Sequence, residues 1–453
     1  MKNPLHRFLI FLVVLFISPI AVFAQQDNLT ASLNNRRLPV GTKEEEKIVT
    51  EGEKKEKADE GKKEKEDEDA GKLSVNGYID SYYFTNFNKP ASRDNLGISG
   101  VGRGFDRRVD QFQLGMVQTV FKFTKKKSEM IADLAYGPSA QYGNYGNVPN
   151  FAPAYGYAIG NDTWTSVIIK QAYWKYNATD KLSFTMGQFG THIGYELIEA
   201  SLNYFYSINN TFNSGVPFYH TGLKGTYVFS DKVSLMLGVV NGFDYVHDNN
   251  RKKGVIGQLA LAPVEGLTTY LNFISTNEAN ADATGKTPKG NFTLYDLNGA
   301  YTFSDKFYIG YWFIYGMQHG TLGSPGTFIP ADGDVDKTKH WWGANLYFVY
   351  TASDLFSIGL RTEMFNNDEG ARGLRSYNAA TETYAGTSAN TVTLTGTFSL
   401  DGGSLLIKPE LRLDQFKKLS GAGLENSQQF MDSDGNFTKN TQTTLGVAAI
   451  YKF

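Results

Sequence analysis

The sequence predicts an all-β protein: a single antiparallel transmembrane β-barrel of about sixteen strands, preceded by a signal peptide and a disordered charged tail. From residue 73 to residue 453, apolar and polar residues alternate with the period of a β-strand. Short turns and long polar loops follow one another along the same region. The composition, with 47 Gly, 32 Phe, 27 Tyr and only 13 Pro, suits strands joined by polar loops.

The composition also excludes several classes of function. The absence of cysteine rules out disulfide scaffolds, cysteine-ligated zinc, iron–sulfur clusters and thiol catalysis. The 44 basic and 46 acidic residues leave no basic excess, so nucleic acid is not an expected partner. The six histidines show no zinc spacing, and the glycine-rich residues 100–104 lack the strand–helix unit of a nucleotide site. We therefore expect neither a cofactor nor a metal.

The first 24 residues have the layout of a secretory signal peptide. Two basic residues precede an apolar run at residues 8–17, and small residues follow up to Ala24. We expect cleavage after Ala24. The alternative is a transmembrane anchor, but Ser18 and Pro19 interrupt the run well before the ~20 apolar residues that a spanning helix needs.

Residues 25–72 form a charged tail, rich in Lys, Glu and Asp. Its few apolar residues show no heptad pattern, which argues against a coiled coil. Such a segment buries too little surface to offset the entropy of ordering, so we predict disorder. We expect it to be a solvated periplasmic linker, and a tether to the cell wall or to a partner is the alternative.

The region 73–453 is predicted to be the barrel. Alternation is clearest near the C-terminus, where Leu411 and Leu413 alternate with Arg412 and Asp414. Turns that contain Ser and Asp, such as 229–232 and 303–306, separate many of the segments. The predicted strands are at about 73–85, 108–124, 128–137, 164–177, 181–190, 216–229, 232–241, 252–262, 267–276, 292–303, 306–318, 339–352, 355–366, 390–400, 404–416 and 440–453.

The order of turns and loops predicts the plan of an outer-membrane barrel. Short turns gather at one end of the strands and long loops at the other. An even number of strands places both ends of the barrel region on the short-turn side, which is the periplasmic side. The sheet must close, because lipid offers no partner to the backbone groups of an edge strand.

Aromatic residues near the strand ends favour this plan over the main alternative, a soluble secreted β-sandwich or propeller. They are expected to form two girdles at the membrane surfaces. These aromatic residues are Tyr173, Trp174, Tyr176, Phe229, Phe303, Trp341, Trp342, Tyr347, Phe348 and Tyr350. The C-terminal Tyr451 and Phe453 resemble the signal read by the outer-membrane barrel assembly machinery. That machinery, outer-membrane lipid and lipopolysaccharide are therefore expected partners.

Several segments resemble one family. They are residues 77–83, 110–114, 191–196 and 217–222, together with Asn203. Each is similar to the beta-barrel porin-2, OmpL-like family, and the similarity runs over most of 73–453. The resemblance implies a pore-forming outer-membrane protein of Gram-negative bacteria, with poorly defined solutes and no functional residues to carry over. Trimers are common among sixteen-stranded porins, so a homotrimer is an open expectation.

A barrel of this size predicts a water-filled channel for passive diffusion of ions and small hydrophilic solutes. The third long loop, about 191–215, is rich in apolar residues, and its exposure outside the cell would be costly. We therefore expect it to fold into the bore as a constriction. The expected constriction residues are Tyr195, Glu196, Glu199 and Tyr204. The alternative is that its aromatic residues cap the rim or form a subunit contact.

The alternation also assigns charges to the pore wall. The predicted pore-lining residues are Asp80, Lys224, Asp296, Arg361, Glu363, Lys408, Glu410, Arg412 and Asp414. Their mixed signs predict weak ion selectivity, with a basic wall facing an acidic loop. These charges could instead only pair along the wall.

Other functions remain open from sequence. A plugged receptor, an adhesin or a structural barrel would act through its extracellular loops. An outer-membrane hydrolase would need Ser and His together at the rim, and the chain has no Gly-x-Ser-x-Gly motif. We therefore expect a protein that is not an enzyme.

Overall fold

The computed structural model describes residues 71–143, 169–246, 248, 250–279, 285–287, 289–319, 337–378, 380–381 and 383–453. The predicted signal peptide, and the charged tail up to residue 70, lie outside the described residues. Residues 164–168, the expected start of the fourth strand, lie outside them as well.

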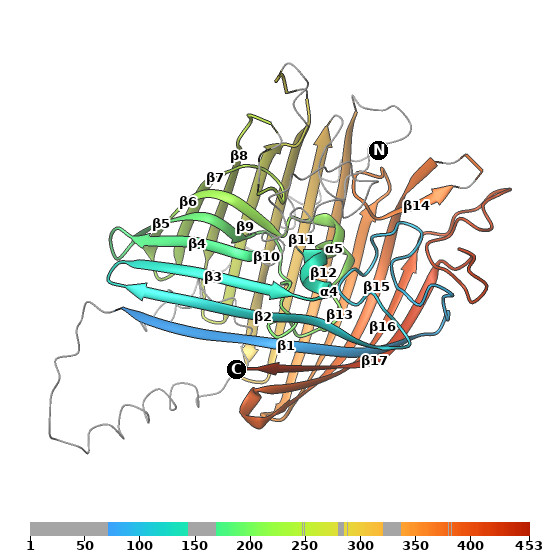
Figure 1. Cartoon of the computed structure of the whole chain (residues 1–453), viewed down its shortest axis with the longest axis horizontal. Coiled ribbons are helices and arrows are strands. Elements are labelled where there is room, and N and C mark those ends of the chain that lie inside the picture. The colour runs from blue at the N-terminus through green and yellow to red at the C-terminus, as the bar shows by residue number, and fades with distance from the viewer. Residues whose placement is uncertain are drawn as a thin grey trace. The chain divides into compact units, whose positions relative to one another are not determined.

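One antiparallel sheet closes into a barrel (Figure 1). Its strands are β1 (Lys72–Asn86), β2 (Phe112–Lys125), β3 (Ser128–Tyr136), β4 (Ile169–Asn177), β5 (Leu182–Gly190), β6 (Tyr219–Ser230), β7 (Val233–Val240), β8 (Gly254–Leu261), β9 (Leu267–Asn277), β10 (Asn291–Ser304), β11 (Phe307–His319), β12 (Thr338–Ser353), β13 (Phe356–Asn367), β15 (Thr383–Leu400), β16 (Leu405–Phe416) and β17 (Thr441–Lys452). Among the described residues these sixteen strands form the closed wall, because β13 pairs directly with β15.

The barrel closes where its first and last strands meet. β1 pairs with β2 on one side and with β17 on the other. Gly77 N–H donates to Phe453 O, and Phe453 N–H donates back to Gly77 O, both at 3.1 Å. Both ends of the barrel region therefore lie at the short-turn end, as predicted.

The predicted sixteen-strand antiparallel barrel is confirmed, and each predicted strand overlaps an observed one. Strand β15 differs most, because it begins at Thr383 and not at about residue 390. The additional elements lie in the long loops or at a turn. Strand β14 (Arg375–Asn378) pairs with the start of β15 as a small hairpin above the wall. The short helices are α4 (Pro138–Gly143), α5 (Asn210–Gly215) and the 3-10 turn η6 (Asp401–Gly403). None of the helices in the described ranges is long and apolar enough to cross a membrane.

Burial in the wall follows the pattern of a membrane barrel. Leu411 and Leu413 point outward and are 42% and 45% exposed. Their neighbours Arg412 and Asp414 point inward and are almost completely buried. Because lipid covers the outer face of such a barrel, apolar residues lie outside and polar residues inside.

The expected aromatic girdles are only partly correct. Trp174, Trp342 and Tyr350 lie on the outer face and are exposed. Trp341 and Tyr347 are buried instead and pack in the interior core. The physical reason is the strand period: successive side chains point to opposite faces, so adjacent aromatic residues cannot share the lipid face.

Candidate functional site: inward loops and the barrel wall

The third long loop, L3 (191–218), lies against the inner wall of the barrel. It leaves β5 and returns to β6, yet its hydrogen bonds reach β12, β13 and β16. All residues from 205 to 220 are buried. Asn209 caps the short helix α5 within this loop, because its side chain accepts a hydrogen bond from Phe212 N–H. L3 is therefore an ordered segment that crosses to distant strands.

Two wall carboxylates bind the backbone of L3. Glu410 accepts hydrogen bonds from Tyr206 N–H at 2.8 Å and from Ser207 N–H at 3.1 Å. Glu363 accepts from Asn210 N–H at 3.1 Å and from Thr211 N–H at 2.6 Å. Hydrogen bonds to a charged acceptor are among the strongest in proteins. These carboxylates thus fix the path of residues 206–211.

Wall cations bind the carbonyl and carboxylate groups of the same loop. Arg361 Nη1 pairs with Glu196 Oε1 at 2.6 Å, and both side chains are buried. Arg412 Nη1 donates to Ile208 O at 2.7 Å. Lys408 Nζ donates to Ala200 O of L3 at 3.1 Å. Burial raises the pKa of Glu196, while Arg361 acts in the opposite direction.

Threonines of β15 complete the polar wall. Thr391 donates to Asp414 at 3.0 Å, and Thr395 donates to Glu410 at 2.7 Å. Arg361 donates to the hydroxyl of Thr393 at 3.0 Å. This inward row connects the charges of β13 to those of β16.

Two of the three aspartates predicted to line the pore, Asp80 and Asp296, also hold L3. Asp80 accepts from Tyr206 O–H at 2.5 Å and from Met116 N–H at 2.8 Å. Asp296 accepts from Gly194 N–H at 3.1 Å. Burial and the neighbouring Asp80 raise the pKa of Tyr206 well above its usual range, so its hydroxyl stays a donor.

Glu199 and Lys224, two further predicted site residues, also contact residues of the barrel strands. Glu199 forms an ion pair with the buried Lys170 of β4. The Lys224 ammonium lies 4.2 Å from the ring centre of Phe189. The acidic loop and basic wall therefore touch, rather than facing each other across an opening.

The tyrosines of L3 show how deep the loop reaches. Tyr195 stacks on Tyr347 with ring centres 4.4 Å apart. Tyr204 contacts Tyr308 at 5.2 Å. Tyr308 is the second residue of β11, directly after a short turn. L3 thus extends from the long-loop mouth to the short-turn end of the barrel.

The sequence reasoning missed a second inward loop, L1 (87–111). Arg103 is buried, forms an ion pair with Asp106 and contacts Asp414 at 3.3 Å. Phe105 packs its ring against Phe212 and Phe218 of L3. The available signal was the apolar character of several residues near the glycine-rich stretch 100–104, which a solvent-exposed loop would not need.

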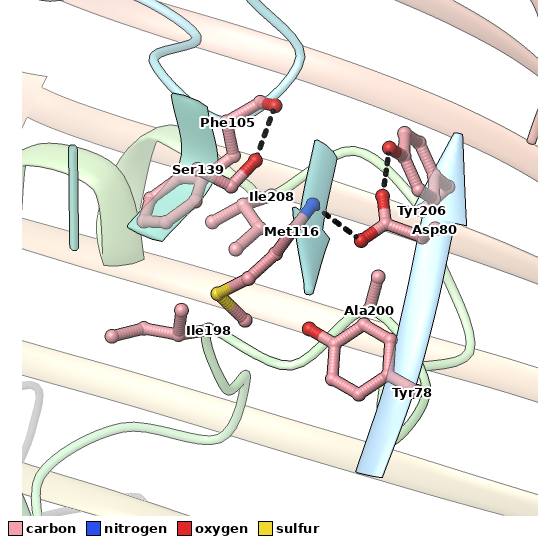
Figure 2. Close-up of a pocket in the computed structure, with 9 residues that line it drawn as sticks. All are labelled: Tyr78, Asp80, Phe105, Met116, Ser139, Ile198, Ala200, Tyr206 and Ile208. Carbon is pink, nitrogen blue, oxygen red and sulfur yellow. Dashed lines mark hydrogen bonds between the residues drawn. The ribbon is translucent and has the colours of Figure 1, made fainter. Parts of the chain in front are cut away.

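A small cavity of mixed polar and apolar lining lies where L1 and L3 meet β1 and β2 (Figure 2). Asp80 links Met116 N–H of β2 to the hydroxyl of Tyr206, and Tyr78 points to the same space. Within the described part of the chain, the buried hydroxyl of Tyr78 has no hydrogen-bond partner. The cavity has room for about one water molecule, which would satisfy this hydroxyl.

A closed antiparallel barrel with an apolar outer face, polar inner wall and inward loops is the architecture of outer-membrane porins. The chain belongs to the family described as "Putative beta-barrel porin-2, OmpL-like", which matches residues 72–453. The family and the barrel support an outer-membrane location.

The chain is also similar, at low sequence identity, to several solved structures. The outer-membrane channel DcaP of Acinetobacter baumannii is 10% identical, covering 84% of this chain and 97% of its own, with a TM-score of 0.51. OprB of Pseudomonas putida is 10% identical, covering 84% and 94%, with a TM-score of 0.49. The anion-selective porin from Comamonas acidovorans is 11% identical, covering 84% and 100%, with a TM-score of 0.48. Among curated proteins, no match is found.

Proposed function

We propose that this protein forms an outer-membrane channel for passive diffusion of ions and small hydrophilic solutes, and that L3 narrows the channel. Family membership supports the channel. One observation carries the narrowing: the buried residues 205–216 of L3 are bound to strands far from the loop's own β5 and β6.

In this proposal the wall charges hold the loop. Arg361, Glu363, Lys408, Glu410 and Arg412 each bond to L3. Because these charges are paired or hydrogen-bonded, a permeating ion meets few unbalanced ones, and weak ion selectivity follows. Asp80 and Asp296 would play the same part, Asp414 would hold Arg103 of L1, and Lys224 would line the bore.

The constriction would be formed by the surface of L3 that stays accessible. Tyr195, Glu199 and Tyr204 are partly exposed, while Glu196 is buried on Arg361. Glu196 would therefore position the loop, and the other three would contact solutes.

The proposal includes the route to the membrane. Residues 1–24 would direct export and be removed after Ala24, and residues 25–72 would remain as a periplasmic tail. Tyr451 and Phe453 would present the assembly signal, and lipid and lipopolysaccharide would surround the barrel. We also propose a homotrimer, which chemical cross-linking of purified protein would test.

A plugged receptor or structural barrel is the second candidate. Its support is the contact between two inward loops, where Phe105 of L1 packs on Phe212 of L3. Two loops that pack together in one bore can close it.

Current recordings in a planar bilayer, made with purified protein under a salt gradient, would separate the two. We expect discrete conductance steps with a reversal potential near zero. Glu363→Gln weakens the binding of the L3 backbone and should raise the conductance of each step. Lys417→Ala, which removes only an exposed pair with Asp368, is the matched control. Correctly inserted protein that carries no current would favour the plugged barrel.

A further inference from the structure

Loop L7 (368–382) places an arginine inside a box of aromatic rings. The guanidinium carbon of Arg372 lies 4.7 Å from the ring centre of Phe243, 5.4 Å from Phe292 and 5.1 Å from Trp341. All four side chains are buried. Aromatic faces attract cations electrostatically, and the attraction grows when water is excluded.

Hydrogen-bond acceptors bind the edge of the Arg372 guanidinium, while the aromatic rings contact its faces. Arg372 Nε donates to Ser214 O of L3 at 2.9 Å, and Nη1 reaches Gln318 Oε1 at 3.5 Å. Rings on the faces and acceptors at the edge match a planar guanidinium better than a compact ammonium.

Two rings of the box, Phe292 and Trp341, belong to strands of the wall, and Phe243 lies in the loop after β7. A side chain at Gly316 would place Cβ 2.1 Å from the Trp341 indole, so this glycine lets the indole lie flat on β11. Trp341 Nε1–H donates to Gly215 O at 3.0 Å. Phe243 N–H donates to Glu278 at 2.9 Å. The rings are therefore held by wall strands, by L3 and, for Phe243, by Glu278 just after β9, independently of L7.

The box lies at the long-loop mouth of the barrel. Phe292 is the second residue of β10, Trp341 the fourth of β12 and Gln318 the last but one of β11. These three strands are neighbours in the wall (Figure 1). A solute that arrives from outside the cell meets this end first.

We propose that the aromatic box of Phe243, Phe292 and Trp341 is a guanidinium-binding site that the chain's own Arg372 occupies, and that a guanidinium-bearing solute, such as one with an arginine side chain, competes for it. Exchange would release L7 from L3. The consequence for permeation rests on the proposed channel, whereas binding to the box does not.

The first test is chemical rescue of Arg372→Ala in the full-length protein folded in detergent. Methylguanidinium should raise the thermal unfolding midpoint of this variant saturably, by about 2 °C at several times its dissociation constant. Methylammonium lacks the planar fork and N-methylurea lacks the charge, so both should raise the unfolding midpoint much less. The double variant with Trp341→Ala should lose the rescue. Equal effects of all three compounds, or none, would overturn the proposal.

The wild-type protein provides a second test that does not depend on the folding of the variant. Methylguanidinium should speed chymotrypsin cleavage within L7 several-fold, and methylammonium should not. An unchanged cleavage rate at saturating methylguanidinium would contradict the competition. Neither the unfolding midpoint nor the cleavage rate depends on conductance. A protein that carries no current in a bilayer would therefore contradict the proposed channel but not the guanidinium-binding site.

Discussion

Two walls of the barrel are buried in different ways. The charged wall consists of the inward residues of β13, β15 and β16, where Arg361, Glu410 and Arg412 are almost completely buried. The apolar wall is the set of apolar inward residues of β7, β8 and β9, such as Met236, Ile256 and Ile274, which are buried in the interior core. The polar Ser234, Gln258 and Asn272 lie among them on the same strands and are not counted in it. The lipid-facing sides of both walls are apolar.

The difference teaches how a flexible loop acquires one position. A buried charge without a partner costs several kcal/mol, so each charge on the charged wall demands a particular group of L3. An apolar surface gains free energy from the area covered, whatever covers it. The charged wall therefore specifies the register of L3, and the apolar wall adds stability without register.

The largest expected effect comes from breaking the ion pair of the charged wall. Arg361→Ala leaves Glu196 buried without its cation, and should lower the free energy of unfolding by about 3–5 kcal/mol. Urea unfolding of the folded protein, followed by tryptophan fluorescence, measures this loss.

The matched control removes both charges. Arg361→Met combined with Glu196→Gln should restore most of the lost stability, because no unpaired charge stays buried. If the double variant is as unstable as Arg361→Ala, the loss comes from packing and not from the unpaired carboxylate.

The next effect is a pH dependence of stability at the long-loop end of β9, beside the apolar wall. Glu278 follows β9 directly, and burial raises its pKa from 4.5 to about 8, with Asp244 acting in the same direction and Arg372 against it. The folded protein holds this proton more tightly than the unfolded chain. The stability from this group is therefore complete below pH 4.5 and is lost as the pH rises to about 8.

Glu278→Gln should remove this pH dependence, which amounts to a few kcal/mol. Unfolding midpoints measured from pH 5 to pH 8 should fall for the wild type relative to the variant. Parallel curves for the two proteins would show that the carboxyl stays charged in the folded state.

A smaller effect is expected at the hydroxyl that joins L3 to β1. Tyr206→Phe removes a 2.5 Å hydrogen bond to Asp80 and leaves its carboxylate with fewer donors. The expected loss is about 1.5–3 kcal/mol, the range for hydrogen bonds to charged groups. Denaturant unfolding checks it, and Tyr204→Phe, which alters another tyrosine of the same loop, is the comparison.

The sequence predicts the walls better than it predicts what covers them. The strand period assigns Arg361, Glu410 and Arg412 to the inner face, and the structure places them there. Which group binds each charge depends on residues far apart in the chain: Glu196 and Arg361 are separated by 165 positions. No local pattern encodes such a pairing.

The errors have a related cause. Trp341 and Tyr347 were expected in a girdle because aromatic residues near strand ends favour the membrane surface. Both are turned inward and buried by loops. For L1 the sequence predicts only a gap between the strands at about 73–85 and 108–124, yet Arg103 reaches the charged wall. Composition identifies a loop, but the path of the loop depends on which wall residues it binds inside the barrel.

The smallest expected effect tests the apolar wall. Ile256 is completely buried, and its Cγ1 packs where Gly238 of the next strand lacks a side chain. Ile256→Val removes one methyl group from this contact and should cost about 0.5–1.5 kcal/mol in urea unfolding. Val255→Ala, on the lipid face of the same strand, should change stability by less than about 0.5 kcal/mol. Since the apolar wall carries no register information, Ile256→Val should leave conductance unchanged. A changed conductance would mean that both walls position L3.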